Sequence, residues 1–194
     1  MNKHSIFSRL IQLGTVATVT IAAPLRADDS QDSKFRFGVG LLYCFPQSDL
    51  KAGAKAGWGR SLFVERDLND GLFCRARAEY SFFGEDKDTY GSRSSADVLS
   101  VMAELGWAFP VPNTNVRPIK VFCGAGFLRP TLKASDPEGS ASESPSGLGM
   151  SAGIEFRESK HWSMSFAYVK SIDMKYHGHD FNLCYWQSTL MWRF

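Results

Sequence analysis

Residues 161–169 decide the fold class of this chain, and they have the sequence HWSMSFAYV. Large apolar side chains at positions 162, 164, 166 and 168 alternate with small or polar ones. Successive side chains of a β-strand point to opposite faces, so a strand gathers these four on one face. The 3.6-residue period of a helix would distribute them around its axis. This stretch therefore predicts a strand with one apolar face.

The same alternation recurs along the chain. In residues 147–157 one face carries Leu148, Met150, Ala152, Ile154 and Phe156. In residues 98–109 one face carries Leu99, Val101, Ala103, Leu105, Trp107 and Phe109. Further strands are predicted near residues 34–44, 55–66, 72–83, 118–129 and 181–194, which makes eight in all. No helical period of useful length interrupts them.

The connections between these strands alternate between two kinds. Those after the second, fourth and sixth strands are short or rich in proline, at residues 67–71, 110–118 and 158–160. The others are polar and mostly longer, at residues 46–54, 84–95, 131–146 and 173–180. Short turns at one end and longer loops at the other are typical of bacterial outer-membrane barrels. The pattern predicts an all-β, eight-stranded, antiparallel up-and-down barrel with both termini on the periplasmic side.

Composition and hydropathy restrict how the chain meets a membrane. Of its 194 residues, 44% are apolar and 22% are charged, which excludes a disordered chain. After residue 27 no apolar run reaches the roughly 18–20 residues that a membrane-spanning helix needs. The mature chain is therefore either soluble or crosses the membrane as strands.

The N-terminal segment predicts export. Lys3, His4 and Arg9 precede a mildly apolar stretch, and a small residue, Ala27, ends the segment. We interpret residues 1–27 as a secretory signal peptide cleaved after Ala27, and residues 28–194 as one barrel domain. The alternative, an amphipathic anchor helix, is weakened by three threonines in the apolar stretch. Cleavage removes three cations from a formal charge of +2, leaving −1, so no electrostatic footprint for nucleic acid remains.

The two faces of the predicted sheet differ in chemistry. The apolar face carries aromatic residues near both strand ends: Phe35, Trp107, Phe109, Trp162, Trp192 and Phe194 toward the periplasm, and Tyr43, Trp58, Phe82, Phe127 and Tyr168 toward the outside. The other face carries ten charged residues: Arg36, Glu65, Arg75, Arg77, Glu79, Glu104, Lys120, Glu155, Arg157 and Arg193. Two aromatic girdles favour lipid on the apolar side, whereas a lipocalin-like soluble barrel would turn that side inward. We therefore expect the charged residues to form a network in the lumen, with Glu104 meeting Arg75 or Arg77.

The C-terminus carries a family resemblance. Residues 185–194 are YWQSTLMWRF, where Trp186, Leu190, Trp192 and Phe194 fit an alternating pattern that ends in phenylalanine, and Ser188 departs from it. This resembles the C-terminal signal of outer-membrane barrels, which implies the barrel-assembly machinery as a partner. Residues 34–194 resemble the small eight-stranded barrels of the OmpX and OmpA-membrane-domain type. The resemblance implies an integral outer-membrane protein of a diderm bacterium. We expect it to be a monomer in contact with outer-membrane lipid and lipopolysaccharide.

The cysteines leave one question open. Cys44, Cys74, Cys123 and Cys184 include no C-x-x-C pair, so a zinc or thioredoxin-type site has little support. Cys44 and Cys184 lie near the outer ends of strands that become neighbours on closure, where a disulfide would be stable in an oxidising compartment. The strand register, however, turns Cys44 inward and Cys184 outward. Cys74 and Cys123 are interpreted as small lipid-facing residues.

Two histidine segments invite functional interpretations. His161 and Ser163 resemble the His/Ser pair of outer-membrane lipid A deacylases, with Glu155 or Glu158 as a third member. The register instead points both residues into the lumen at the periplasmic side, away from the outer leaflet. His177-Gly178-His179-Asp180 is interpreted as a polar hairpin, because further ligands for a metal are not evident. We expect no metal and no cofactor.

Fold alone does not settle function, since barrels of this group range from structural proteins and adhesins to lipid-modifying enzymes. The main hypothesis is a non-enzymatic barrel with a structural or surface-interaction role carried by its outer loops. The alternatives are a deacylase-like lipid A-modifying enzyme and a small pore or carrier of apolar molecules.

Overall fold

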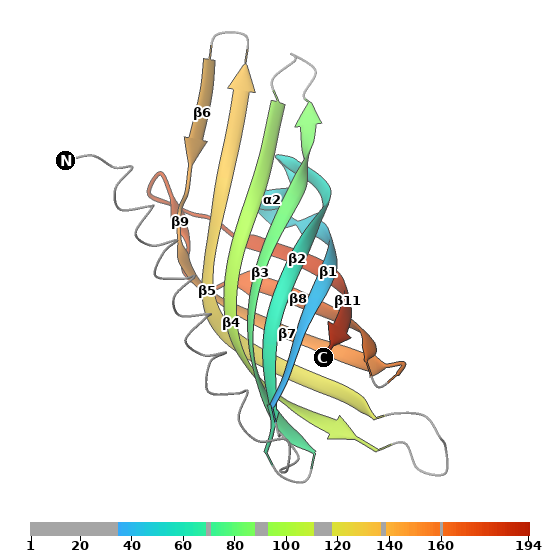
Figure 1. Cartoon of the computed structure of the whole chain (residues 1–194). Helices are drawn as coiled ribbons and strands as arrows, with labels where there is room; N and C mark the ends of the chain where they lie inside the picture. The colour runs from blue at the N-terminus through green and yellow to red at the C-terminus, as the bar shows by residue number, and fades with distance from the viewer. Residues whose placement is uncertain (1–34, 69–70, 88–92, 111–117, 137–138, 160) are drawn as a thin grey trace, which may run out of the picture. The chain divides into compact units, whose positions relative to one another are not determined.

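The computed structural model describes residues 35–68, 71–87, 93–110, 118–136, 139–159 and 161–194; the predicted signal peptide and its cleavage site lie outside them. Eight antiparallel strands form a closed barrel (Figure 1): β1 (Phe35–Gln47), β2 (Ala54–Asp67), β3 (Leu72–Lys87), β4 (Arg93–Phe109), β5 (Ile119–Asp136), β7 (Gly147–Arg157), β8 (Trp162–Ser171) and β11 (Leu183–Arg193). Each pairs with its neighbour in this order, and β11 returns to pair with β1. The eight-stranded up-and-down barrel is confirmed.

Three smaller elements of secondary structure lie at the outer end of the barrel. The single-turn helix α2 (Ser48–Lys51) follows β1, and β6 (Gly139–Glu143) pairs with the last residues of β5. β9 (Lys175–Tyr176) and β10 (His179–Asp180) form a separate hairpin. No helix in the described ranges is long and apolar enough to cross a membrane.

Several strands continue beyond their predicted ends. β3 and β4 extend into the predicted loop 84–95, and β5 with β6 occupies much of the predicted loop 131–146. These extensions project at the top of Figure 1. Both of their faces carry polar residues, and β6 is exposed throughout, so alternation between apolar and polar positions gives no signal there. Backbone pairing continues where the sequence pattern stops.

The strands are tilted, as closure of a barrel requires. A path can be traced around the barrel from Leu41 by stepping from each residue to its paired residue on the next strand. Through β2, β3 and β4 this path reaches Arg129 on β5. In the other direction, through β11, β8 and β7, it reaches Ile119 on β5. The two endpoints lie ten residues apart on one strand. This stagger is the shear that links strand tilt to strand number in a closed barrel.

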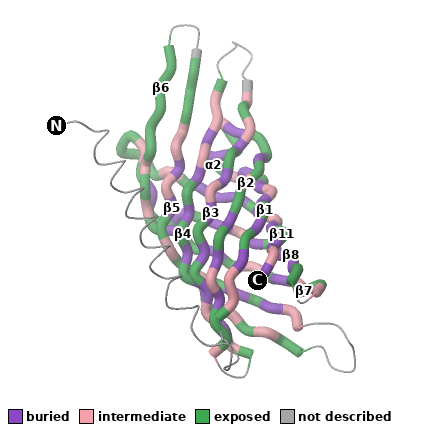
Figure 2. The backbone as a smooth tube through the Cα atoms, in the orientation of Figure 1, coloured by how far each residue is buried: buried purple, intermediate pink, exposed green. Residues whose placement is uncertain are grey.

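Burial alternates along the strands, as the purple and green steps of Figure 2 show. Outward positions expose large apolar side chains, with Leu41 64% and Leu62 56% exposed, while inward positions such as Leu42 are fully buried. The outer wall is therefore mostly apolar, and the buried charged residues, such as Glu65 and Arg75, face inward. This confirms the orientation predicted for a lipid-facing barrel and excludes the lipocalin-like arrangement.

The lumen has two layers. Along β3 the inward residues that follow Phe73 are Arg75, Arg77, Glu79, Ser81 and Phe83, so charge gives way to apolar side chains toward the outer end. There an apolar cluster fills the barrel; its members are Leu42, Cys44, Leu50, Ala54, Phe83, Ala96, Val98, Met102, Leu128, Val169, Met174, Leu183 and Tyr185. Leu50 of α2 is among them, which explains why this short helix lies at the barrel end. The alternation of the strands predicts the charged layer, whereas the apolar plug was not predicted.

Candidate functional site

Eight ionisable side chains form the buried centre of the lumen on the periplasmic side of the apolar plug, a region called the lower lumen below. They are the four cations Arg75, Arg77, Lys120 and Arg193 and the four carboxylates Glu65, Glu79, Glu104 and Glu155. Their strands, β2, β3, β4, β5, β7 and β11, surround the lumen, and each side chain occupies an inward position of the alternation. The formal charges cancel, as a confined low-dielectric space requires.

Glu65 is the hub of this network. Its carboxylate lies 2.5 Å from Arg75 Nη2 and 2.5 Å from Lys120 Nζ. Arg36 approaches it to 2.9 Å, and Arg193 to 4.0 Å. One fully buried carboxylate thus faces four cations that come from four different strands.

Glu104 and Glu155 connect the remaining arginines. Glu104 lies 2.6 Å from Arg77 Nη2 and 3.7 Å from Arg75 Nη1, so it meets both arginines suggested for it by the register. Glu155 pairs with Arg75 and with Arg193. Glu79 lies 3.2 Å from Arg77 and accepts hydrogen bonds from Gln187 and Ser100 at the boundary with the apolar plug.

Three phenylalanine rings enclose the network, and sequence reasoning missed them. The Arg75 guanidinium lies 5.5, 5.3 and 5.4 Å from the ring centroids of Phe63, Phe73 and Phe122. Lys120 Nζ lies 4.4 Å from the centroid of Phe73, which is also within cation–π range. The sequence did carry a signal that Phe63 points into the lumen. Phe63 occupies an inward position of the strand alternation and lies opposite a glycine, and its ring fills the space that a Cβ on Gly38 would need.

Two predicted members lie at the periplasmic rim. Arg36 is half-buried and pairs with Glu65 and with Asp67. Arg157 is also half-buried and donates a hydrogen bond to the carbonyl oxygen of Ser159 at 3.2 Å. The predicted set of ten therefore divides into eight buried residues and two at the rim.

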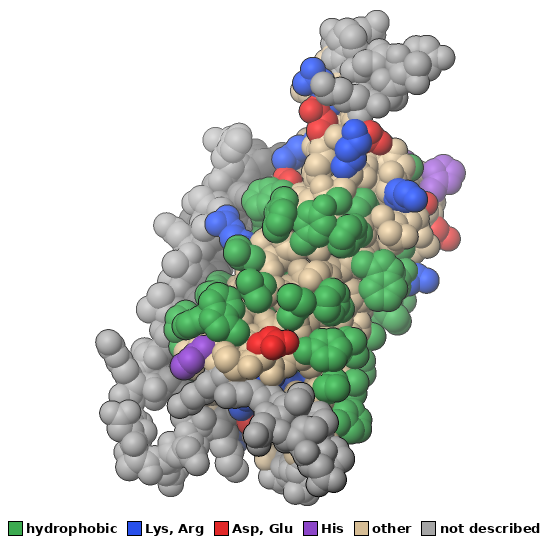
Figure 3. All heavy atoms as spheres, turned by 90° about the vertical axis from the view of Figure 1, so that its right-hand side faces the viewer, with side chains coloured by type: hydrophobic (Ala, Val, Ile, Leu, Met, Phe, Trp, Pro, Cys, Tyr) green, Lys and Arg blue, Asp and Glu red, His purple; other side chains and the backbone are tan. Residues whose placement is uncertain are grey.

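The predicted girdle residues lie on the outer wall, where Figure 3 shows hydrophobic side chains gathered. Phe35, Trp58, Phe82, Trp107, Phe109, Phe127 and Trp162 are exposed, and Tyr43 and Tyr168 are half-exposed. Ring pairs link neighbouring strands, with centroids 4.7 Å apart for Tyr43–Trp58 and 4.3 Å for Trp162–Trp192.

The C-terminal residues of the predicted assembly signal also face outward. Trp186, Leu190 and Phe194 are exposed, and Trp192 is half-exposed. The Phe194 amide donates a hydrogen bond to the carbonyl oxygen of Phe37 at 3.0 Å, which holds the chain end against β1.

The predicted position of His161 was wrong. Its side chain is exposed and stacks on Trp192 at 5.4 Å, because β8 begins one residue later and the strand alternation does not reach it. Ser163 does lie in the lumen, where it accepts a hydrogen bond from Arg193 Nη1 at 2.6 Å. The two side chains therefore lie in different environments and do not form a nucleophile–base pair. This removes the residue constellation on which the deacylase interpretation rested.

The cysteines are free thiols. Cys44 pairs with Gln187 in the ladder and Cys184 with Gln47, so the two are three positions apart on opposite faces. Cys44 lies in the lumen beside Ser81, and Cys184 contacts Ser48 Oγ at 3.1 Å. Cys184 occupies an outward position of the strand alternation. It is nevertheless buried, because it contacts the segment that includes α2.

The second histidine segment forms the predicted hairpin. Its turn contains His177 and Gly178, both at positive φ, and glycine adopts that conformation without steric cost. His177 lies 3.1 Å from Glu143 of β6. No cluster of three or more metal-ligating side chains occurs in the described part of the chain.

Comparisons with known proteins agree with this fold. A family model described as "Outer membrane protein beta-barrel domain" matches residues 13–194, while no curated protein matches the chain. Ail of Yersinia pestis, an attachment invasion locus protein, is 17% identical with a TM-score of 0.58 over 82% of this chain and 97% of that chain. Neisserial surface protein A is 13% identical with a TM-score of 0.53 over 84% and 98%. The N-terminal barrel of Pseudomonas aeruginosa OprF is 11% identical with a TM-score of 0.52 over 81% and 97%.

These structures share the barrel fold, and the family match spans nearly the whole sequence. The chain therefore belongs to the outer membrane protein β-barrel family and is an integral protein of the bacterial outer membrane.

Proposed function

We propose that this protein is a non-enzymatic outer-membrane barrel that acts through its projecting hairpins, with the lumen serving only as a structural core. The observation that carries the proposal is the two-layered lumen, where balanced ion pairs lie beneath an apolar plug. A filled interior argues against the pore or carrier alternative. We further expect the barrel-assembly machinery to read the C-terminal signal, and the barrel to be a monomer.

The hairpins offer a polar recognition surface. A cleft of about 390 Å³ lies among β3, β4, β5 and β6. Hydroxyl groups of five serines line it: Ser94, Ser95, Ser135, Ser140 and Ser142. Its cations are each matched by an acid, with Arg93 3.6 Å from Glu85 and Lys133 2.5 Å from Asp97. The serine hydroxyl groups of this cleft can donate and accept hydrogen bonds, so they are suited to bind the polar groups of extracellular saccharides. Ail of Yersinia pestis, which has the same fold, crystallised with the heparin analogue sucrose octasulfate.

The test measures retention of cells displaying the full chain on immobilised heparin and on immobilised neutral dextran. Alanine at Ser94, Ser95, Ser140 and Ser142 together should reduce retention at least fivefold on whichever glycan the wild type binds. The control, Ser159→Ala at the periplasmic end, should leave retention unchanged. Wild-type cells that bind neither glycan, or a quadruple variant that binds like wild type, would refute the saccharide role.

A further inference from the structure

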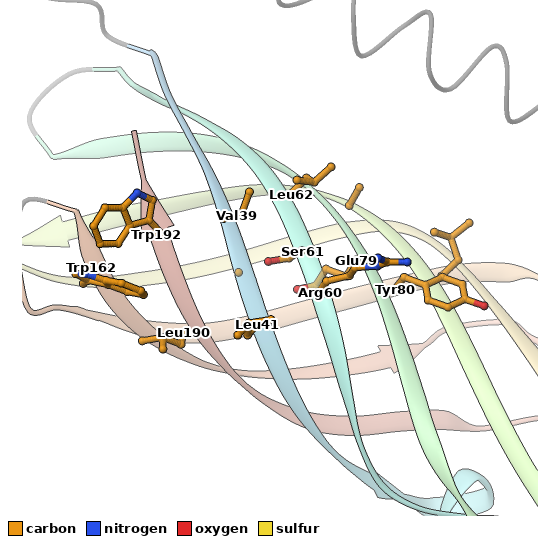
Figure 4. Close-up of a pocket in the computed structure, with 13 residues that line it drawn as sticks. Val39, Leu41, Arg60, Ser61, Leu62, Glu79, Tyr80, Trp162, Leu190 and Trp192 are labelled. Carbon is orange, nitrogen blue, oxygen red and sulfur yellow. The ribbon is translucent and has the colours of Figure 1, made fainter.

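A small hollow, here called the mouth pocket, lies at the outer end of the barrel and is lined by α2, β4, β5, β6 and β9. Its volume is about 180 Å³. Sites for drug-sized molecules occupy roughly 300–1,000 Å³, so the mouth pocket fits only a small group. Another hollow, of about 670 Å³, lies on the outer wall among lipid-facing side chains such as Leu41 and Leu190 (Figure 4). The mouth pocket differs from it in combining an apolar floor with aromatic and acidic walls.

The floor of the mouth pocket is the upper surface of the apolar plug. Leu50, Ala54 and Ala96 belong to the plug and also line the pocket, and Leu132 packs against the same cluster. These side chains offer no hydrogen bonds, so burying an N–H or O–H group against them costs free energy. The floor therefore favours a ligand whose buried part consists of methyl or methylene groups.

Two aromatic rings form one wall of the pocket. The centroids of Tyr176 and Phe181 lie 5.9 Å apart, with the ring planes inclined by 56°. The negative face of an aromatic ring attracts cations, and quaternary ammonium groups are well-known ligands of such rings. Phe181 is held without a ligand, because it packs against the plug and its amide donates a hydrogen bond to the carbonyl oxygen of Met174 at 2.8 Å.

A carboxylate of α2 stands beside this aromatic wall. Asp49 lines the mouth pocket and accepts a hydrogen bond from the backbone N–H of Asn182 at 2.8 Å. Asn182 directly follows Phe181, so this bond fixes the acid next to the ring. The partner in the bond is a neutral amide, and among the described residues no cation forms an ion pair with Asp49. Its negative charge can therefore attract a cationic ligand.

The remaining charged groups of the lining do not reverse this preference. Lys133 is the cation that lines the pocket, and its Nζ lies 2.5 Å from the carboxylate of Asp97. Glu143 adds a second acid to the lining, 3.1 Å from Nε2 of His177. The lining thus contains two acids and one cation that is already paired, which favours a positive ligand.

We propose that the mouth pocket binds a trimethylammonium group, such as that of choline. Its methyl groups lie on the apolar floor, and its positive charge faces Asp49 and the rings of Tyr176 and Phe181. A primary ammonium is less suitable, because it would lose hydrogen bonds to water at the floor, whereas a trimethylammonium group has no N–H bonds to lose.

This site is separate from the proposed saccharide role. Ser94 and Ser95 border both hollows, but Asp49, Tyr176 and Phe181 do not line the saccharide cleft. Variants at these three positions therefore leave the glycan retention test unaffected, and either proposal can fail without the other.

The test follows amide chemical shifts of the isotope-labelled full chain during titration with choline. The protein is folded in a maltoside detergent, because phosphocholine detergents carry the proposed ligand group. Two matched compounds separate the contributions: dimethylbutanol has carbon in place of the nitrogen, and ethanolamine lacks the methyl groups. Choline should bind about fivefold or more tightly than either, and the shifts should centre on Asp49, Tyr176 and Phe181.

Glycerophosphocholine distinguishes two sources of the same group. Binding as tight as that of choline identifies a lipid headgroup, and weaker binding identifies the free cation. Both results support the trimethylammonium site.

Substitutions separate the charge from the rings. Asp49→Asn keeps an oxygen for the Asn182 amide, so it should weaken choline binding about fivefold and leave dimethylbutanol unchanged. Tyr176→Leu should weaken choline binding by a similar factor, whereas Tyr176→Phe should bind like wild type, because the ring and not the hydroxyl contacts the cation. Asp180→Asn is the control, since Asp180 is an exposed acid of β10 that does not line the pocket.

Gel mobility of unboiled samples verifies that each variant is folded. Equal affinity of the wild type for choline and dimethylbutanol would overturn the proposal, as would equal choline binding by wild type and Asp49→Asn. Absence of any shift at the lining residues would also refute the site.

Discussion

Replacing Glu65 with glutamine is expected to lower the free energy of unfolding by about 3–5 kcal/mol, the cost of breaking a buried ion pair from one side. The Glu65 carboxylate is fully buried and faces Arg75, Lys120, Arg36 and Arg193. Glutamine keeps the volume but removes the negative charge, which leaves the surrounding cations with too few acids. The measurement is equilibrium urea unfolding of the barrel in phospholipid vesicles, followed by tryptophan fluorescence.

An exposed ion pair supplies the control for this prediction. Glu85 lies 3.6 Å from Arg93, and both side chains are about half exposed. Exposed pairs contribute about 0–1 kcal/mol, so Glu85→Gln should shift the unfolding midpoint little. Equal shifts for Glu65→Gln and Glu85→Gln would mean that water reaches the lower lumen and screens its charges.

Replacing Leu42 with alanine is expected to cost about 2–5 kcal/mol, because Leu42 is fully buried in the apolar plug and its loss leaves a cavity. The adjacent residue Leu41 is 64% exposed on the outer wall. Leu41→Ala should cost less than half as much, since lipid fills the space that the side chain leaves.

The same urea titration of both variants in vesicles measures this difference. A larger loss for Leu41→Ala than for Leu42→Ala would show that the plug is loosely packed. It would also show that lipid contact contributes more to stability than the interior does.

Much of the barrel was predictable because a membrane-spanning strand obeys one simple rule. Lipid demands apolar side chains at every second position, so residues such as Leu105 and Phe166 identify the strand and its apolar face, and the aromatic girdles indicate that this face meets lipid. Strand parity then places Glu65, Arg75 and Glu104 inside without further information. Their pairing follows, because a barrel of eight strands is only wide enough for its own side chains.

The features that were missed depend on contacts across the lumen or on water. Lys120 reaches Glu65, which lies on a strand that is not its neighbour, and ladder partners carry no information about such a contact. The strand extensions at residues 84–86 and 133–135 are exposed or half-exposed, so their side chains need not alternate. His161 was misplaced because its strand begins one residue later than the pattern suggested.

Conductance of the purified full chain in a planar lipid bilayer tests most directly the central claim, that the lumen is a closed structural core. The wild type should give no stable current steps above background, under conditions in which an open sixteen-stranded porin conducts. Persistent, voltage-independent channels in the wild type would contradict it, because ions would then pass both the ion-paired layer and the apolar plug.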